Sequence, residues 1–419
     1  MKDHRTENAP IEWVGDRQDV PGALFFLSTL GQRLGLWISG FPFPIVLLLA
    51  PLVIVAGIVH NRLRFSIARG ACFLALLIVV AVSYVFAQSE WASAQSALLF
   101  VAMYAPWAFF APVSRTHYNK YVVRVAFWTS VMAVLAAVQF FGQYAIKSEL
   151  WFSWRSVIPE MFLIEYNTLN EVSYGSAIYK GNGFFLLEPS VLSGIIARVF
   201  LLTVLVLQDV RFAFPLSVGL LFALSGTGVV FTLIFTVPIL LLRLARKFSA
   251  GATSAFVAVA FVAVATLWFG TFIGDYASGR LGEFTDPRSS GYARFTGTLN
   301  IFEQYLTNDL KNFLIGYGPG TFKQVTQAIS VSEEVFGSGW IKLFIEYGLL
   351  GLSAFTVFFL YCVYSSTRSL LLSVALLFQY LILDGPVLVP QLVFVCYAIF
   401  VLPVTVGVRR DETIAAHPP

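Results

Sequence analysis

Residues 43–87 of the chain read FPIVLLLAPLVIVAGIVHNRLRFSIARGACFLALLIVVAVSYVFA, a pattern that recurs along the rest of the sequence. Two apolar stretches, 43–59 and 70–87, flank a connection at 60–69 that carries three arginines. A helix needs about 20 largely apolar residues to cross a bilayer, so each stretch is predicted to span a membrane. Short connections rich in Lys and Arg stay in the cytoplasm, which puts the 60–69 connection on that side.

The same alternation extends in both directions from this segment. Basic residues occur in both chain termini and in the connections 114–124, 208–211, 243–247 and 365–369. The intervening turns at 41–43, 87–91, 225–228 and 384–388 contain none. We therefore predict that the basic connections and both termini are cytoplasmic. Two long polar loops, 145–188 and 275–338, are then external.

The predicted fold class is all-α, a polytopic integral membrane protein of about twelve transmembrane helices with two large external loops. Hydrophobic residues make up 58% of the chain and charged residues only 12%, whereas a soluble domain carries roughly 25% charge. The predicted spans are 23–40, 43–59, 70–87, 92–113, 121–144, 189–207, 212–225, 227–242, 252–274, 341–363, 369–384 and 388–406. We interpret residues 1–419 as a single membrane domain, and the polar N-terminal tail predicts no cleavable signal peptide.

Two of these predictions admit an alternative. The span at 23–40 contains Gln32 and Arg33 near its middle, which also suits an interfacial helix. The pair at 212–225 and 227–242 is short for two crossings. Removing one span alone would place a basic connection on the wrong side, whereas removing two would restore the alternation downstream.

Four local patterns follow one another in the second half of the chain. They are NGFFLLEPS at 182–190, LSGTG at 224–228, Arg294 followed by LIGYGPG at 314–320, and GSGWIKLFIEYGLLGL at 337–352. In this order, and with about twelve predicted spans, the chain resembles the O-antigen polymerase and ligase superfamily (the Wzy and WaaL families). Those are bacterial inner-membrane glycosyltransferases that use polyprenyl-pyrophosphate-linked sugars. The first five spans share only the topology.

The last pattern favours the polymerase branch of the superfamily. Ligases typically begin it with His-Asn or His-Ser, whereas this chain has Gly337 and Ser338. No histidine lies outside the predicted cytoplasmic segments, so another external histidine cannot substitute. The resemblance implies a multi-pass inner-membrane polymerase of exopolysaccharide or capsule repeat units, which joins undecaprenyl-pyrophosphate-linked oligosaccharides at the outer face. The implied partners are that lipid-linked oligosaccharide, membrane lipid, a chain-length regulator and a flippase, with no nucleic acid.

The chemistry of such a transfer also follows from the residues. A pyrophosphate carrier leaves as an anion, and fixed cations must stabilise the charge that develops on it. Arginine suits phosphate because its planar fork binds bidentately. The external loops contain no Asp-x-Asp pair and no His or Cys cluster, so we expect a metal-independent site without a cofactor. A carboxylate near the membrane face is expected to orient the acceptor hydroxyl or take its proton.

These requirements give two sets of candidates. The candidate catalytic residues are Arg294, Glu188, Arg198 and Glu346. The candidate substrate-binding residues are Lys180, Arg280, Arg288, Lys342 and Ser338. Arg294 matches the family's loop arginine, and Lys180 stands where relatives often carry an arginine.

Several candidates also have a purely structural interpretation. An Arg at the bilayer centre costs about 2.5–3.5 kcal/mol, so Arg198 needs either a polar cavity or an ion-pair partner. Glu188 precedes a helix and would complement its dipole. Lys342 and Glu346 are four residues apart and would pair on one helix face.

Two other functions compete with the polymerase. A ligase of the same superfamily would attach finished polymer to another acceptor. A transporter or lipid-linked sugar flippase would also suit about twelve spans, but carriers place polar residues mid-membrane in several spans. In this chain the predicted spans are apolar apart mainly from Arg33 and Arg198, and this scarcity of polar residues disfavours transport.

Overall fold

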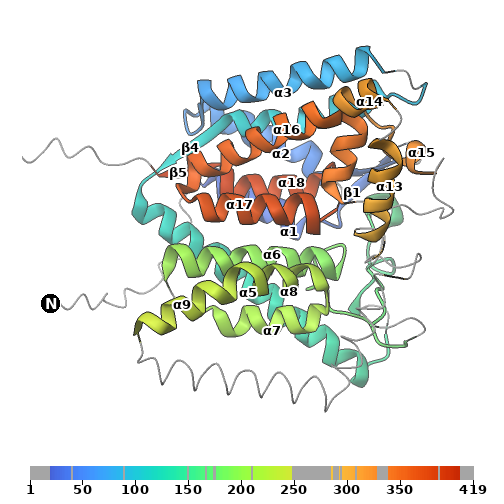
Figure 1. The fold of residues 1–419 in the computed structure, drawn as a ribbon. Helices are drawn as coiled ribbons and strands as arrows, with labels where there is room; N and C mark the ends of the chain where they lie inside the picture. Colours follow the sequence, from blue (N-terminus) through green and yellow to red (C-terminus); the bar gives the residue numbers. More distant parts are fainter. Residues whose placement is uncertain are drawn as a thin grey trace, which may run out of the picture.

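The computed structural model describes residues 19–38, 41–87, 90–148, 151–165, 168–172, 176–208, 211–247, 295–306, 309–327, 338–385 and 387–405, with Thr285 and Tyr292. This part of the chain is mostly helical (Figure 1). The helices are α1 (Val20–Leu30), α2 (Ile45–Val59), α3 (Ile67–Val85), α4 (Ala94–Tyr104), α5 (Arg115–Ala145), α6 (Pro189–Leu202), α7 (Ala213–Ala223), α8 (Gly226–Phe231), α9 (Val237–Lys247), α13 (Thr296–Leu306), α14 (Leu310–Ile315), α15 (Phe322–Gln327), α16 (Gly339–Thr367), α17 (Leu370–Phe378) and α18 (Pro390–Cys396).

Short π-helical turns extend several of these helices. They are η4 (Thr203–Leu207) after α6, η5 (Thr232–Thr236) between α8 and α9, η6 (Gln379–Leu383) after α17, and η7 (Tyr397–Val401) after α18. The 3₁₀ turns are η1 (Ala105–Ala108) and η3 (Glu160–Phe162). The strands are β1 (Gly35–Ile38), β2 (Phe41–Pro44), β3 (Arg64–Phe65), β4 (Phe109–Val113) and β5 (Pro403–Thr405).

Membrane character is supported by the length and composition of the helices. Within the described residues, five helices are long and apolar enough to cross a bilayer: Ile67–Val85, Arg115–Ala145, Pro189–Leu207, Gly226–Arg243 and Gly339–Thr367. Five further apolar helices have 10–17 residues. The expected mostly helical membrane fold is therefore confirmed in this coarser form. About twelve crossings remain a prediction, and the expected span at 252–274 lies outside the described residues.

Serine caps mark the first residues of several helices. The hydroxyls of Ser66, Ser93, Ser114 and Ser369 accept hydrogen bonds from backbone N–H groups in the first turns of α3, α4, α5 and α17. Those N–H groups have no partner within the helix, so a capping oxygen stabilises each start.

Two predicted spans differ most from their predictions. The span at 92–113 is α-helical only as far as Tyr104, and Phe109–Val113 is strand β4. The other is the first span, 23–40. Helix α1 ends at Leu30, and Gly35–Ile38 instead pairs in an antiparallel hairpin with Phe41–Pro44. The cause is the polar pair Gln32 and Arg33, because both side chains are fully buried and bind partners far along the chain.

The two ends of the bundle carry different parts of the chain (Figure 1). One end carries β1, α13, α14, α15 and the segment between α5 and α6. The other end carries the small sheet β3-β4-β5, in which β3 pairs antiparallel and β5 parallel with β4. The described parts of both predicted external loops thus share one end, and the arginine-rich 60–69 connection lies at the other. Their orientation in a membrane remains a prediction.

Burial separates a central helix from peripheral ones. Twelve of the 14 residues of α6 are buried. Helix α3 instead buries one stripe of five residues, spaced three and four apart, against α16. Its outward apolar side chains, such as Ile67 and Val85, remain exposed, as expected for a surface that faces lipid.

Candidate functional site

The first pattern, residues 182–190, forms an irregular segment just before α6. Gly183 and Phe184 both adopt left-handed backbone conformations, with φ of 69° and 67°. Gln139 of α5 holds this segment, because its Oε1 accepts hydrogen bonds from the N–H groups of Asn182 at 3.0 Å and Gly183 at 2.8 Å. Its Nε2 donates to Asn182 Oδ1 at 2.9 Å. A buried, non-helical backbone is therefore satisfied by one buried amide.

Gln32 and Arg33 bind the same segment from the end of α1. Gln32 Oε1 accepts a hydrogen bond from Leu187 N at 2.9 Å. The Arg33 guanidinium donates to Phe184 O at 2.8 Å, forms an ion pair with Glu165 and lies 4.3 Å from the Trp154 ring centroid. The two polar residues that complicate the first predicted span therefore anchor the segment between α5 and α6.

The second pattern, residues 224–228, packs on the first turns of α6. Gly228 N donates to Ser193 Oγ at 3.0 Å, and Ser193 Oγ donates to Ser225 O at 3.3 Å. A Cβ at Gly228 would overlap the hydroxyl and backbone of Ser193, whereas a Cβ at Gly226 would meet nothing within 4 Å. The first two patterns thus form one unit around the N-terminal half of α6.

The third and fourth patterns form a second unit. Gly348, with φ of 66°, breaks α16 and releases the carbonyls of the preceding turn. The Ile345 carbonyl accepts from Tyr317 N at 2.8 Å, and the Glu346 carbonyl accepts from Gly318 N at 3.0 Å. A Cβ at Gly316 would lie 2.5 Å from the Glu346 backbone, so only glycine permits this approach.

Lys342 and Glu346 form the ion pair that their spacing predicts. Lys342 Nζ lies 2.7 Å from Glu346 Oε1, with the Glu346 carboxylate fully buried and the Lys342 side chain 17% exposed. Ser338, also fully buried, is the N-cap of α16. Among the described residues, neither Ser338 Oγ nor Glu346 Oε2 has a hydrogen-bond partner. The start of α16 therefore combines a cation, an anion and two unsatisfied polar oxygens.

Arg198 forms a buried ion pair between α6 and η6. One of its terminal nitrogens lies 2.9 Å from Asp384 Oδ2, and its Nε donates to Gly194 O at 3.1 Å. Gln379 Nε2 donates to the same carbonyl at 3.0 Å. The sequence allowed Arg198 either a polar cavity or an ion-pair partner, and the structure shows the ion pair. A direct role of Arg198 in the chemistry remains a prediction.

Glu188 lies at the N-cap of α6, but its side chain makes no hydrogen bond to the helix backbone. Its Oε2 accepts a hydrogen bond from Ser190 Oγ at 2.9 Å, and the side chain is only partly buried. The helix dipole still favours an anion at this position. Of the candidate carboxylates, Glu188 is thus the one with access to solvent and without an ion pair to a described Lys or Arg.

The other basic candidates divide between buried and undescribed residues. Lys180 is 7% exposed, and its backbone N–H donates to Asn170 O at 2.8 Å. The predicted arginines Arg280, Arg288 and Arg294 lie outside the described residues. Lys342, Glu346 and Ser338 therefore lie together at the start of α16, whereas Glu188 lies at the start of α6. Both helix starts are at the same end of the bundle (Figure 1).

Sequence reasoning missed Gln139, Glu165 and Asp384. A signal existed for Asp384, because a mid-span arginine needs an acid and Asp384 is the acid of a predicted external turn. For Gln139, the signal was an amide within an apolar run. In the part of the chain that the structure describes, no group of three His, Cys, Asp or Glu side chains has the arrangement of a metal site.

Comparison with known proteins adds no assignment. No protein-family model matches the chain, and no curated protein matches it. The function is therefore argued from the residues and their geometry.

Proposed function

We propose that this protein is a membrane polysaccharide polymerase, which joins undecaprenyl-pyrophosphate-linked oligosaccharide repeat units at the outer face of the bacterial inner membrane. One observation carries the proposal: the described parts of four sequence patterns, spread over residues 182–352, lie in two compact units at one end of the helical bundle. The same end carries the described parts of both long polar segments. Loops on a rigid scaffold are where binding and catalytic groups concentrate.

In the proposed reaction, the acceptor hydroxyl oxygen attacks the anomeric carbon of the donor glycan. The bond from that carbon to the phosphate oxygen breaks, and undecaprenyl pyrophosphate leaves with the electron pair. Arg294, with Arg280, Arg288 and Lys180, stabilises the departing negative charge. This arrangement uses side-chain cations and requires no metal ion.

We assign the acceptor side to Glu188 ahead of Glu346. Glu188 is partly exposed, and among the described residues its carboxylate accepts a hydrogen bond from Ser190, so it can still accept the proton of an incoming hydroxyl. Glu346 is fully buried and already paired with Lys342. Its role in the proposal is to position Lys342 and Ser338 at the start of α16.

Deletion of the gene and size analysis of the lipid-linked glycans test the proposal. Single repeat units should accumulate on the carrier, and wild-type protein should restore long polymer. Arg294→Ala and Glu188→Gln should fail to restore it, since loss of a general base or of a charge-stabilising group typically slows a reaction about 100-fold or more. Glu160→Gln is the matched control, because it removes an exposed carboxylate from the same segment.

The outcome also separates the two rival functions. Long polymer retained on the carrier would assign the protein to the ligase branch of the superfamily. Unchanged pools of both single repeats and polymer would count against the polymerase, the ligase and a lipid-linked sugar flippase, and would leave a transporter of another substrate. Full restoration by Arg294→Ala would count against the assigned role of that arginine.

A further inference from the structure

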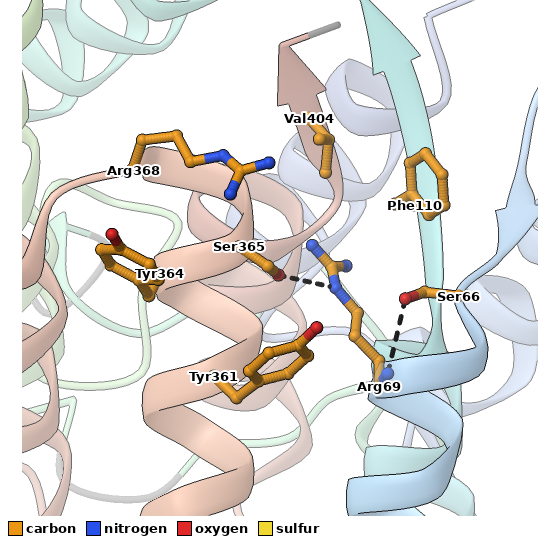
Figure 2. Close-up of a pocket in the computed structure, with 8 residues that line it drawn as sticks. All are labelled: Ser66, Arg69, Phe110, Tyr361, Tyr364, Ser365, Arg368 and Val404. Atoms are coloured by element: carbon orange, nitrogen blue, oxygen red, sulfur yellow. Dashed lines mark hydrogen bonds between the residues drawn. The ribbon is translucent and has the colours of Figure 1, made fainter.

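A cavity of about 240 Å³ lies at the opposite end of the bundle from the candidate site. Four parts of the chain line it: the first turn of α3, the end of α16, strand β4 and strand β5. Figure 2 shows the guanidinium groups of Arg69 and Arg368 approaching this one space from α3 and α16. None of the lining residues is acidic.

The two arginines are held differently. Arg69 is 1% exposed, and its guanidinium donates to Ser365 Oγ at 2.9 Å, Ser366 Oγ at 2.6 Å, Val401 O at 3.0 Å and Phe109 O at 3.3 Å. One of its five N–H groups and its positive charge remain for a ligand. Arg368 is the exposed C-cap residue of α16. Neither arginine forms an ion pair with a described carboxylate, so two like charges share one small cavity. Such an arrangement attracts an anion.

Hydroxyl groups complete the lining. Tyr361 and Tyr364 lie one turn apart on α16, and Ser66 adds a third hydroxyl, whereas Ser365 Oγ already donates to Cys362 O at 2.9 Å. Planar guanidinium groups together with hydroxyl donors suit the oxygens of a phosphate group. The cavity therefore offers donors and positive charge to one class of ligand.

The surface around the cavity is apolar and aromatic. Tyr361 is 37% and Tyr364 is 44% exposed, and the neighbouring Phe65 and Ile67 are 56% and 82% exposed. Aromatic side chains beside basic residues are typical of the boundary between membrane and water. On the predicted orientation, this boundary faces the cytoplasmic leaflet, whose anionic lipids attract basic segments.

We propose that this cavity binds a phosphate group, presented by the headgroup of an anionic phospholipid. Arg69 and Arg368 hold the phosphate oxygens from two sides, and the lipid chains lie along the exposed apolar surface. The proposal does not depend on the glycan chemistry, because it concerns residues at the other end of the molecule.

The test is native mass spectrometry of the full-length protein with phosphatidylglycerol, with phosphatidylcholine and with inorganic phosphate. The Arg368→Gln variant should weaken phosphatidylglycerol binding about tenfold or more, the effect of losing a hydrogen bond to a charged group. Arg64→Gln is the matched control, because Arg64 is an exposed arginine at the same end that does not line the cavity. Tyr364→Phe removes one hydroxyl and provides a second, milder variant.

Selective retention of phosphatidylglycerol that falls in Arg368→Gln and Tyr364→Phe, but not in Arg64→Gln, supports the lipid site. Binding of inorganic phosphate alone with the same variant dependence supports the phosphate site and identifies a soluble anion as its occupant. Equal losses in Arg368→Gln and Arg64→Gln overturn the proposal, because they indicate diffuse attraction. Equal retention of both lipids overturns it as well.

Discussion

Replacing the ion pair between Arg198 and Asp384 gives a quantitative test of the helical core. The two side chains are 2% and 7% exposed, and their charged atoms are 2.9 Å apart. At an effective dielectric constant of about 20, unit charges at that distance attract by about 6 kcal/mol before the cost of desolvation. Removing one partner leaves the other charge buried, so Arg198→Met or Asp384→Leu alone should cost about 3–5 kcal/mol.

The double variant should recover most of that loss, because apolar replacement of a buried pair is often neutral or stabilising. Unfolding in mixed detergent micelles, measured for the wild type, both single variants and the double variant, gives the coupling free energy. We expect about 3 kcal/mol or more. Arg155→Met is the control, because Arg155 is 66% exposed and its pairing with Glu165 should contribute at most about 1 kcal/mol. Losses that simply add in the double variant would refute the reasoning.

Three further predictions concern the packing of the two units. Gly228→Ala should lower the melting temperature because the added Cβ overlaps Ser193, whereas Gly226→Ala should have little effect. Equal melting temperatures of the two variants would contradict the packing of Gly228 on Ser193. Gly348→Ala should lower the free energy of unfolding by at least about 1–3 kcal/mol, because φ is positive at this position and the added Cβ overlaps the backbone of α14. Unfolding in micelles measures this loss. Arg33→Gln should increase hydrogen exchange in residues 151–165 by releasing Glu165, and unchanged exchange would refute the anchoring role.

Much of the fold was predictable because long apolar runs are local signals. The predicted spans at 43–59, 121–144 and 189–207 correspond to α2, to α5 and to α6 with η4. The Lys342–Glu346 pair was predictable for the same reason, because its partners are four residues apart on one helix.

The remaining features depend on partners that are distant in the sequence. A buried Arg33 or Arg198 requires a counter-charge, but the sequence does not say which of the many acids supplies it. Glu165 and Asp384 are 132 and 186 residues away from their arginines, respectively. The hairpin that replaces the end of the predicted first span has the same origin, since burying Arg33 requires the chain to leave the helix.

The packing of residues 316–320 on the break in α16 was also beyond the sequence. The glycines predict a turn, and Gly348 is compatible with either a continuous or a broken helix. Only the hydrogen bonds from Tyr317 and Gly318 to the released carbonyls show why the helix breaks at this point.

Reconstitution tests the central claim most directly. Purified protein in proteoliposomes would be given undecaprenyl-pyrophosphate-linked repeat units without added metal ions, and the glycans would be separated by size. The account predicts a ladder of products that differ by one repeat unit, with release of undecaprenyl pyrophosphate, and loss of the ladder in the Arg294→Ala variant. Movement of the intact lipid-linked unit across the membrane with no ladder would contradict it.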